Sequence, residues 1–113
     1  MLTEKDYCDY ETCVALERLG FNDSTDLRYN HSQILGDFLG GVKAPTLYEA
    51  QKWLREEKHL HIEIRWFSNL WYEYEVNEAE GKILAEGSAF KTYEEALSTA
   101  IYMATEHLKE EEK

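Results

Sequence analysis

The chain has 113 residues, of which 43% are hydrophobic and 13% aromatic, so it is long enough and apolar enough to fold as one domain with its own core. Its net charge is −11, from 23 acidic and 12 basic residues. This balance argues against nucleic-acid binding, in which Lys and Arg side chains hold phosphates.

Targeting segments and disulfides are not expected either. The first residues, MLTEKDYCDYE, contain no apolar run of the kind that forms a signal peptide, and no stretch approaches the roughly 20 apolar residues that span a bilayer. Cys8 and Cys13 do not form a secreted disulfide framework, and Cys13 suits a buried free thiol. We expect a cytoplasmic protein that binds no membrane and no cofactor.

The first helix is predicted within DYETCVALERLGF, residues 9–21. Asp9 can cap it, because its carboxylate can accept an early backbone N–H. Gly20 is placed to end the helix in the left-handed conformation, with Phe21 folding back on the last turn. This helix accounts for most of the N-terminal part of the domain, residues 1–21.

The connection over residues 22–45 is harder to interpret. It contains turn-forming residues, two adjacent glycines and one short apolar patch made of Ile34, Leu35, Phe38 and Leu39. A loop of this length without secondary structure is uncommon in a compact domain. We therefore predict either a short helical turn around residues 32–39 or a mobile, functional segment.

The second helix has a clear start. Thr46 and Glu49 form a capping box, in which each side chain bonds the other residue's free backbone N–H. Apolar residues then recur at helical spacing, and the helix should run to about Lys58. From His59 the spacing of apolar residues changes to two, which is typical of a strand.

Three strands are predicted after this helix, at residues 59–66, 70–77 and 83–90. The first two alternate apolar and polar residues, so one side faces the core and the other faces water. Trp66 and Tyr72 are both assigned to the buried side. The links are short, with Ser68 and Asn69 in the first turn and Gly81 in the second, which indicates an antiparallel meander.

The last helix repeats the start signal with Thr92 and Glu95. An apolar stripe follows, made of Tyr93, Ala96, Leu97, Ala100, Ile101, Ala104 and Leu108. The acidic run over residues 108–113 is expected to fray as a solvated tail. The predicted fold class is α+β, a single domain over residues 1–113 in which an N-terminal helix precedes an α-β-β-β-α two-layer sandwich over residues 46–110.

The α-β-β-β-α order is also that of double-stranded-RNA-binding domains. Those domains bind RNA partly through lysines at the start of the last helix. Here this turn reads TYEEALSTA, with Glu94 and Glu95 in place of lysine. The topology fits that class, while the charge excludes its function.

A metal site is one hypothesis for the exposed side of the first strand. His59, His61 and Glu63 are spaced two apart, so on a strand their side chains point the same way. Two imidazoles and a carboxylate suit zinc, with a fourth position open for water. The simpler interpretation is that strand alternation requires polar residues here, because isolated motif matches have low specificity.

A protein-contact surface is predicted at the first hairpin. Phe67 and Trp71 should lie opposite the core or at the turn, beside the charged residues Glu73 and Glu75, and aromatic residues are enriched at interfaces. The alternative is a cross-strand aromatic pair that stabilises only the hairpin. No nucleophile motif or phosphate loop is present, so an enzyme is the less favoured class.

Three stretches of the chain resemble a known set of proteins. They are DYETCVALERLGF, APTLYEAQKWLREEKHLHIEI and FKTYEEALSTAIYMATEHL. In this order they resemble small uncharacterised proteins carried by phages and mobile elements of gut bacteria. The resemblance covers most of the chain outside residues 22–43. It implies a compact cytoplasmic α+β domain and no activity, substrate or site residue.

Three functions from different classes follow. The leading hypothesis is a non-enzymatic interaction module that binds a protein partner or a second copy of itself. The alternative is an acidic mimic of DNA that inhibits a host DNA-processing protein. Its candidate carboxylates are either Glu63, Glu73 and Glu75 on the sheet or Glu94, Glu95, Glu106 and Glu110 on the last helix. The basic residues that speak against it are Lys52, Arg55, Lys58 and Arg65. A metal protein or enzyme using His59 and His61 ranks last.

Overall fold

The computed structural model describes residues 1–111, which form three α-helices and two antiparallel three-stranded sheets. The helices are α1 (Tyr10–Arg18), α2 (Leu47–Glu57) and α3 (Tyr93–Glu111), and a short 3-10 turn, η1 (Glu4–Asp6), precedes them. The strands are β1 (Leu27–Tyr29), β2 (Leu35–Gly36), β3 (Val42–Ala44), β4 (Leu60–Phe67), β5 (Trp71–Glu78) and β6 (Ile83–Phe90).

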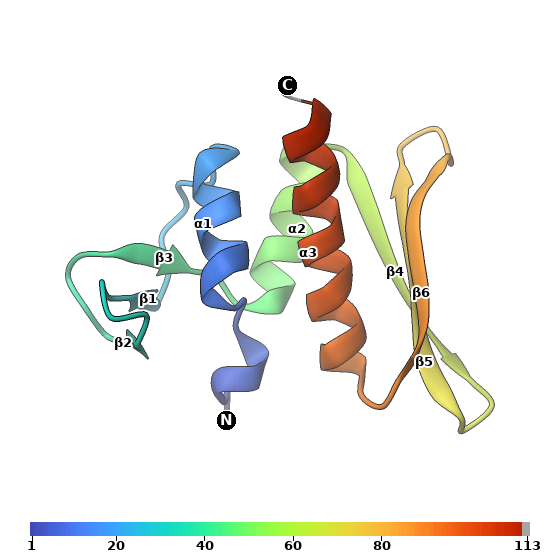
Figure 1. Ribbon diagram of the computed structural model, residues 1–113, viewed down its shortest axis with the longest axis horizontal. Helices are drawn as coiled ribbons and strands as arrows, with labels where there is room; N and C mark the ends of the chain where they lie inside the picture. The colour runs from blue at the N-terminus through green and yellow to red at the C-terminus, as the bar shows by residue number, and fades with distance from the viewer. Residues whose placement is uncertain (112–113) are drawn as a thin grey trace.

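The two sheets lie on opposite sides of a layer of helices (Figure 1). α3 packs on all three strands of the large sheet, whose order is β4-β5-β6, and α2 packs on β4. α1 packs on α3 and on β3 of the small sheet, whose order is β2-β1-β3. The molecule therefore has three layers, which follow one another along its longest dimension of 41 Å.

The predicted α+β fold is confirmed. From residue 46 onward the order is α2-β4-β5-β6-α3, and the three strands form the expected antiparallel meander. The small sheet adds a layer that the sequence pattern did not predict. Residues 22–45 contain its three short strands, and β2 lies where a helical turn around residues 32–39 was considered.

Local hydrogen bonds set the ends of α1 as predicted. The Asp9 carboxylate accepts a hydrogen bond from the Thr12 backbone N–H at 2.8 Å. At the other end Gly20 has a φ of 107°, a left-handed value that glycine adopts without strain. The Phe21 N–H then donates to the Leu16 carbonyl at 2.9 Å, and the Phe21 ring is buried. The chain therefore turns back under α1 toward the small sheet.

The starts of α2 and α3 also follow the predicted capping pattern. In α2 the Thr46 N–H donates to the Glu49 carboxylate at 2.8 Å, and the Glu49 N–H donates to the Thr46 hydroxyl at 3.1 Å. In α3 the Glu95 N–H donates to the Thr92 hydroxyl at 3.1 Å. These bonds satisfy N–H groups that the first helical turn leaves without a partner.

α3 is the longest helix and carries the predicted buried stripe, except that Tyr93 in its first turn is 43% exposed. Its buried apolar residues are Ala96, Leu97, Ala100, Ile101, Ala104 and Leu108. The helix continues to Glu111, so the expected fraying from residue 108 is not seen as far as Glu111, and residues 112–113 of that tail lie outside the described part. Within residues 1–111, no helix combines the length and the apolar character that crossing a membrane requires.

One core cluster connects the three layers. Its largest fully buried apolar side chains come from α1, α2, α3 and β5, and they are Leu16, Leu54, Ile101 and Val76. Phe21 and Trp53 add an edge-to-face aromatic contact with ring centroids 5.5 Å apart. Because helices and both sheets share this cluster, the helix layer is buried on its two sides.

The large sheet differs from the prediction at both ends of β4. The strand begins at Leu60, and His59 lies outside it with a left-handed φ of 59°. At the other end Trp66 was assigned to the core but is 61% exposed. Its cross-strand neighbour Tyr72 makes an edge-to-face contact with Tyr93, where α3 begins, so beyond this point no helix covers the sheet. The end of the β4–β5 hairpin projects past α3 (Figure 1).

Candidate protein-interaction surface

The side of the large sheet that faces away from the helices carries the four predicted interaction residues. Cross-strand register forms four pairs on this side: Phe67 with Trp71, Arg65 with Glu73, Glu63 with Glu75, and Glu75 with Glu86. The intervening residues Ile62, Ile64, Tyr74 and Val76 pack into the core. Since side chains alternate along a strand, Phe67, Trp71, Glu73 and Glu75 share one side.

This side of the sheet carries several carboxylates. We call Glu63, Arg65, Glu73, Glu75 and Glu86 the acidic face. Three of its glutamates, Glu63, Glu75 and Glu86, form a row across β4, β5 and β6, with neighbouring strands about 4.8 Å apart. Like charges directly opposite each other destabilise a sheet, so this row is costly for folding.

Arg65 is the single cation of the acidic face. Its Nη2 atom donates to the Glu75 Oε2 atom at 2.7 Å. This hydrogen bond and the Glu75 charge, together with the charges of Glu63 and Glu73, raise the pKa of the exposed Arg65 guanidinium. Four carboxylates against one guanidinium leave this side of the sheet strongly negative.

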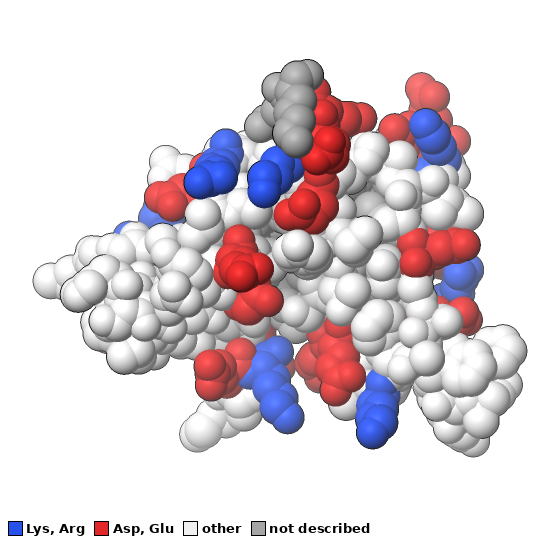
Figure 2. Space-filling model, viewed as in Figure 1, with Lys and Arg blue, Asp and Glu red and all other residues white. Residues whose placement is uncertain are grey.

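Next to the acidic face, the end of the hairpin is apolar. We call Trp66, Phe67, Leu70 and Trp71 the aromatic tip. The Phe67 and Trp71 rings stack with centroids 5.5 Å apart and an interplanar angle of 13°, as the cross-strand interpretation predicts. Phe67 nevertheless remains 48% exposed and Leu70 65% exposed. On the face shown in Figure 2, this projecting end at the lower right carries no charged groups.

A tight turn closes the aromatic tip between Phe67 and Trp71. Ser68 and Asn69 both have left-handed φ values, 46° and 61°, and the Leu70 N–H donates to the Phe67 carbonyl at 2.8 Å. The predicted strand start at residue 70 is therefore part of the turn. The Trp71 Nε1 donor is buried without a hydrogen-bond partner among the described residues, so this surface holds one unsatisfied polar group.

The predicted metal ligands are not brought together. His59 lies outside β4, and His61 and Glu63 are exposed on the acidic side of the sheet. Within residues 1–111, three other side chains could instead hold a metal ion, because their ligand atoms all lie within 4.8 Å of one another. They are Glu78, His107 and Glu111. Sequence spacing missed this group because β5 and α3 contribute to it separately.

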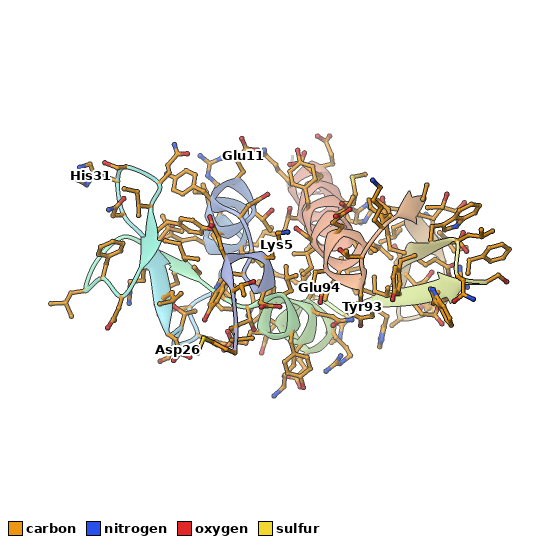
Figure 3. The ribbon with its side chains drawn as sticks, turned by 90° about the horizontal axis from the view of Figure 1, so that it is seen from below. Lys5, Glu11, Asp26, His31, Tyr93 and Glu94 are labelled. Atoms are coloured by element: carbon orange, nitrogen blue, oxygen red, sulfur yellow. The ribbon has the colours of Figure 1, made fainter. Side chains whose placement is uncertain are left out.

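A cleft of about 820 Å³ lies between η1 and the start of α3. Lys5 and Glu94, labelled in Figure 3, line it from these two elements. Its acidic lining residues are Glu4, Asp6, Asp9, Glu94 and Glu95, and Lys5 is the cation among the described lining residues. Two of the carboxylates already act locally, since Asp6 accepts from the Thr3 N–H and Asp9 caps α1. The charged groups that line the cleft are therefore predominantly acidic.

Comparison with protein-family models, with curated proteins and with solved structures found no match to this chain. The resemblance to small phage and mobile-element proteins therefore stays a prediction. The site has to be interpreted from its own geometry and charge.

Proposed function

We propose that this protein is a protein-interaction module that binds a partner through the aromatic tip and the adjacent acidic face. The observation that carries this proposal is the continuity of the two surfaces. Phe67 and Trp71 stack at the end of the same strands that hold Glu73 and Glu75. A few residues supply most of the binding energy at protein interfaces, and Trp, Tyr and Arg are enriched among them. Surrounding charge influences partner choice and association rate.

The charge favours a cationic partner over a second copy of the chain for this surface. Two acidic faces would repel each other, because each carries four carboxylates and one guanidinium. A basic partner would instead neutralise the row formed by Glu63, Glu75 and Glu86. Its apolar pocket would cover the aromatic tip, including the exposed Leu70. The predicted homodimer remains an outcome that the experiment below distinguishes.

The test compares variants in capture from lysates of cells that express the protein, followed by affinity measurement with the captured partner. Leu70→Glu changes the tip at a side chain that is already 65% exposed. Glu73→Lys combined with Glu86→Lys reverses charge on the acidic face. Each variant should weaken binding of the same basic partner by at least about tenfold, as hot-spot substitutions do.

Matched controls lie on α2, away from the surface. Tyr48→Glu is the control for the tip, because Tyr48 is 64% exposed. Glu56→Lys with Glu57→Lys makes the same charge change outside the acidic face. If these controls weaken binding as much as the surface variants, the proposed surface is wrong. If light scattering shows a dimer and Leu70→Glu disrupts it, the partner at this surface is a second copy of the chain and not a basic protein.

A second candidate function is DNA mimicry. The glutamate row across three strands is the observation that favours it, since it presents regularly spaced carboxylates on one surface. Arg65 lies next to this row and pairs with Glu75, which interrupts a purely negative surface. The test is binding to a DNA-processing protein. An affinity that falls steeply from low to high salt and that is unchanged in Leu70→Glu would support the mimic over the interaction module.

A further inference from the structure

The end of β5 places a carboxylate where the strand pattern assigns a core residue. Tyr72, Tyr74 and Val76 precede Glu78 on the helix-facing side of β5, and Tyr74 and Val76 are buried. Register pairs Glu78 with the buried Leu60 of β4. The Glu78 side chain is half-buried and forms no ion pair with any Lys or Arg of the described residues. A carboxylate in such a position is costly unless something compensates its charge.

The last turns of α3 bring two more ligand groups to the same place. His107 and Glu111 are four residues apart, so they lie on one face of the helix. The His107 Nε2 atom and the Glu111 Oε1 atom are 3.1 Å apart. His107 is half-buried, and the following residue, Leu108, belongs to the core.

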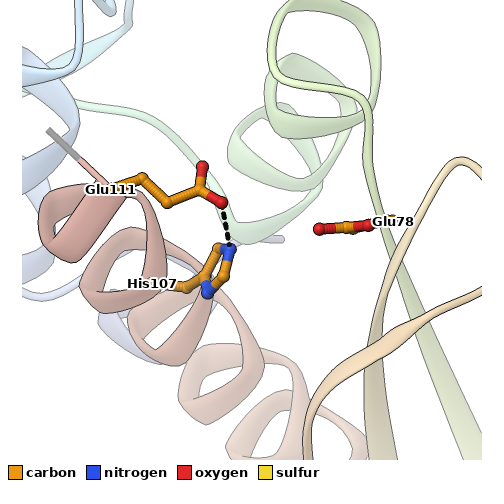
Figure 4. Close-up of side chains that lie close together, drawn as sticks. All are labelled: Glu78, His107 and Glu111. Atoms are coloured by element: carbon orange, nitrogen blue, oxygen red, sulfur yellow. Dashed lines mark hydrogen bonds and ion pairs between the residues drawn. The ribbon is translucent and has the colours of Figure 1, made fainter.

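The three side chains converge from two elements that are distant in sequence (Figure 4). One ligand atom from each of Glu78, His107 and Glu111 lies within 4.8 Å of the other two. Metal–ligand bonds of about 2.1 Å place two ligands of one ion roughly 3–3.5 Å apart. Small rotations of the two glutamate side chains therefore suffice to reach that geometry.

We propose that Glu78, His107 and Glu111 bind a divalent first-row transition-metal ion. An imidazole with two carboxylates suits Mn²⁺, Co²⁺ or Zn²⁺, and it leaves further coordination positions for water. The ion neutralises the two carboxylates and joins the end of β5 to the end of α3. The site is at the opposite end of β5 from the aromatic tip, so it is independent of the proposed interaction surface.

The experiment measures binding of Mn²⁺ and of Co²⁺ to the full chain by calorimetry and by thermal unfolding. Both ions should raise the melting temperature, by an amount that increases with metal concentration because only the folded state holds the complete ligand set. Glu78→Gln keeps the size of the side chain and removes its charge. It should weaken metal binding by at least about 10–100-fold, the loss seen even for groups that only support a ligand.

Control variants separate this site from other ligand groups. Glu80→Gln, in the exposed turn after Glu78, should bind the metal as the wild type does, and so should the double variant His59→Gln with His61→Gln. A Co²⁺ spectrum without a thiolate charge-transfer band would show that the buried Cys8 and Cys13 are not the ligands.

Two results would overturn the proposal. One is the absence of both binding heat and any rise in melting temperature at millimolar Mn²⁺ and Co²⁺. The other is equal metal affinity in the wild type and in Glu78→Gln. Leu70→Glu, which tests the interaction surface, should leave metal binding unchanged, so failure of one proposal does not imply failure of the other.

Discussion

The two sheets of this protein are specified in different ways. β4, β5 and β6 have eight residues each, whereas β1, β2 and β3 have three, two and three. In β4 and β5 the alternation of residues sets which side faces the core. The small sheet depends on contacts between distant residues: the Tyr29 hydroxyl donates to the Cys8 carbonyl at 2.8 Å, and Lys43 Nζ donates to the Asn22 carbonyl at 2.9 Å.

This difference teaches where local pattern suffices and where it does not. A strand of eight residues repeats its pattern often enough to be recognised, and α2 and α3 bury one side of it. A strand of two or three residues has no periodicity. Its position is decided by α1 and by the N-terminal segment, and Tyr29 packs edge-to-face on Tyr10 of α1 with ring centroids 5.7 Å apart.

Tyr74→Ala in the large sheet should have the largest effect. The Tyr74 ring is 5% exposed, packs 5.7 Å from the Phe90 ring between centroids, and occupies the space that a side chain on Gly87 would need. Removing it should lower the free energy of unfolding by about 3–5 kcal/mol, measured by urea denaturation. Tyr48→Ala, at a 64% exposed position of α2, should change it by no more than about 0.5 kcal/mol. Equal losses in both variants would contradict the importance of this core position.

Gly41→Ala should affect the small sheet selectively. Gly41 has a left-handed φ of 95°, and a Cβ atom there would collide with the Tyr29 carbonyl. The expected loss is about 1–3 kcal/mol. Amide hydrogen exchange should accelerate in β1 and β3 and stay slow in β5. Gly40→Ala is the matched control, because a Cβ at Gly40 meets open space. Uniform acceleration in both sheets would mean that they unfold as one unit.

Tyr29→Phe should give the smallest effect. It removes the hydroxyl that donates to the Cys8 carbonyl and should cost about 1 kcal/mol in urea denaturation at neutral pH, as the loss of a typical buried hydrogen bond does. No change at neutral pH would show that water replaces the bond without cost.

The same variant also tests the electrostatics of the small sheet. Burial raises the pKa of Tyr29 from 10.0 to about 12. Between pH 10 and about 12 the folded state therefore holds a proton that the unfolded state has released. The stability that this proton contributes is complete below pH 10 and is lost as the pH rises through this window. The wild type should lose stability more steeply there than Tyr29→Phe, and parallel profiles would contradict the assignment. Burial also raises the pKa of Tyr74. The wild type and Tyr29→Phe both contain Tyr74, so its contribution to the pH dependence cancels in the comparison.

The interaction surface was predictable in part. Strand alternation placed Phe67, Trp71, Glu73 and Glu75 on one side, because the side-chain period of two leaves no other choice once the register is set. The exposure of Trp66 was not predictable, since it depends on where α3 begins and therefore on how far the helix layer covers the sheet. Glu86 was missed because shifts in the β5–β6 register alter which residues of β6 face outward.

The sequence by itself determined the helix starts and, in the large sheet, the strand order and the acidic side. Those features depend on residues within three or four positions of one another, such as Thr46 and Glu49, or on strict alternation. Only the tertiary structure decided the small sheet, the exposure of Trp66 and the meeting of Glu78 with His107. Each of these requires contacts between segments far apart in the chain, and packing creates such contacts without leaving a local pattern.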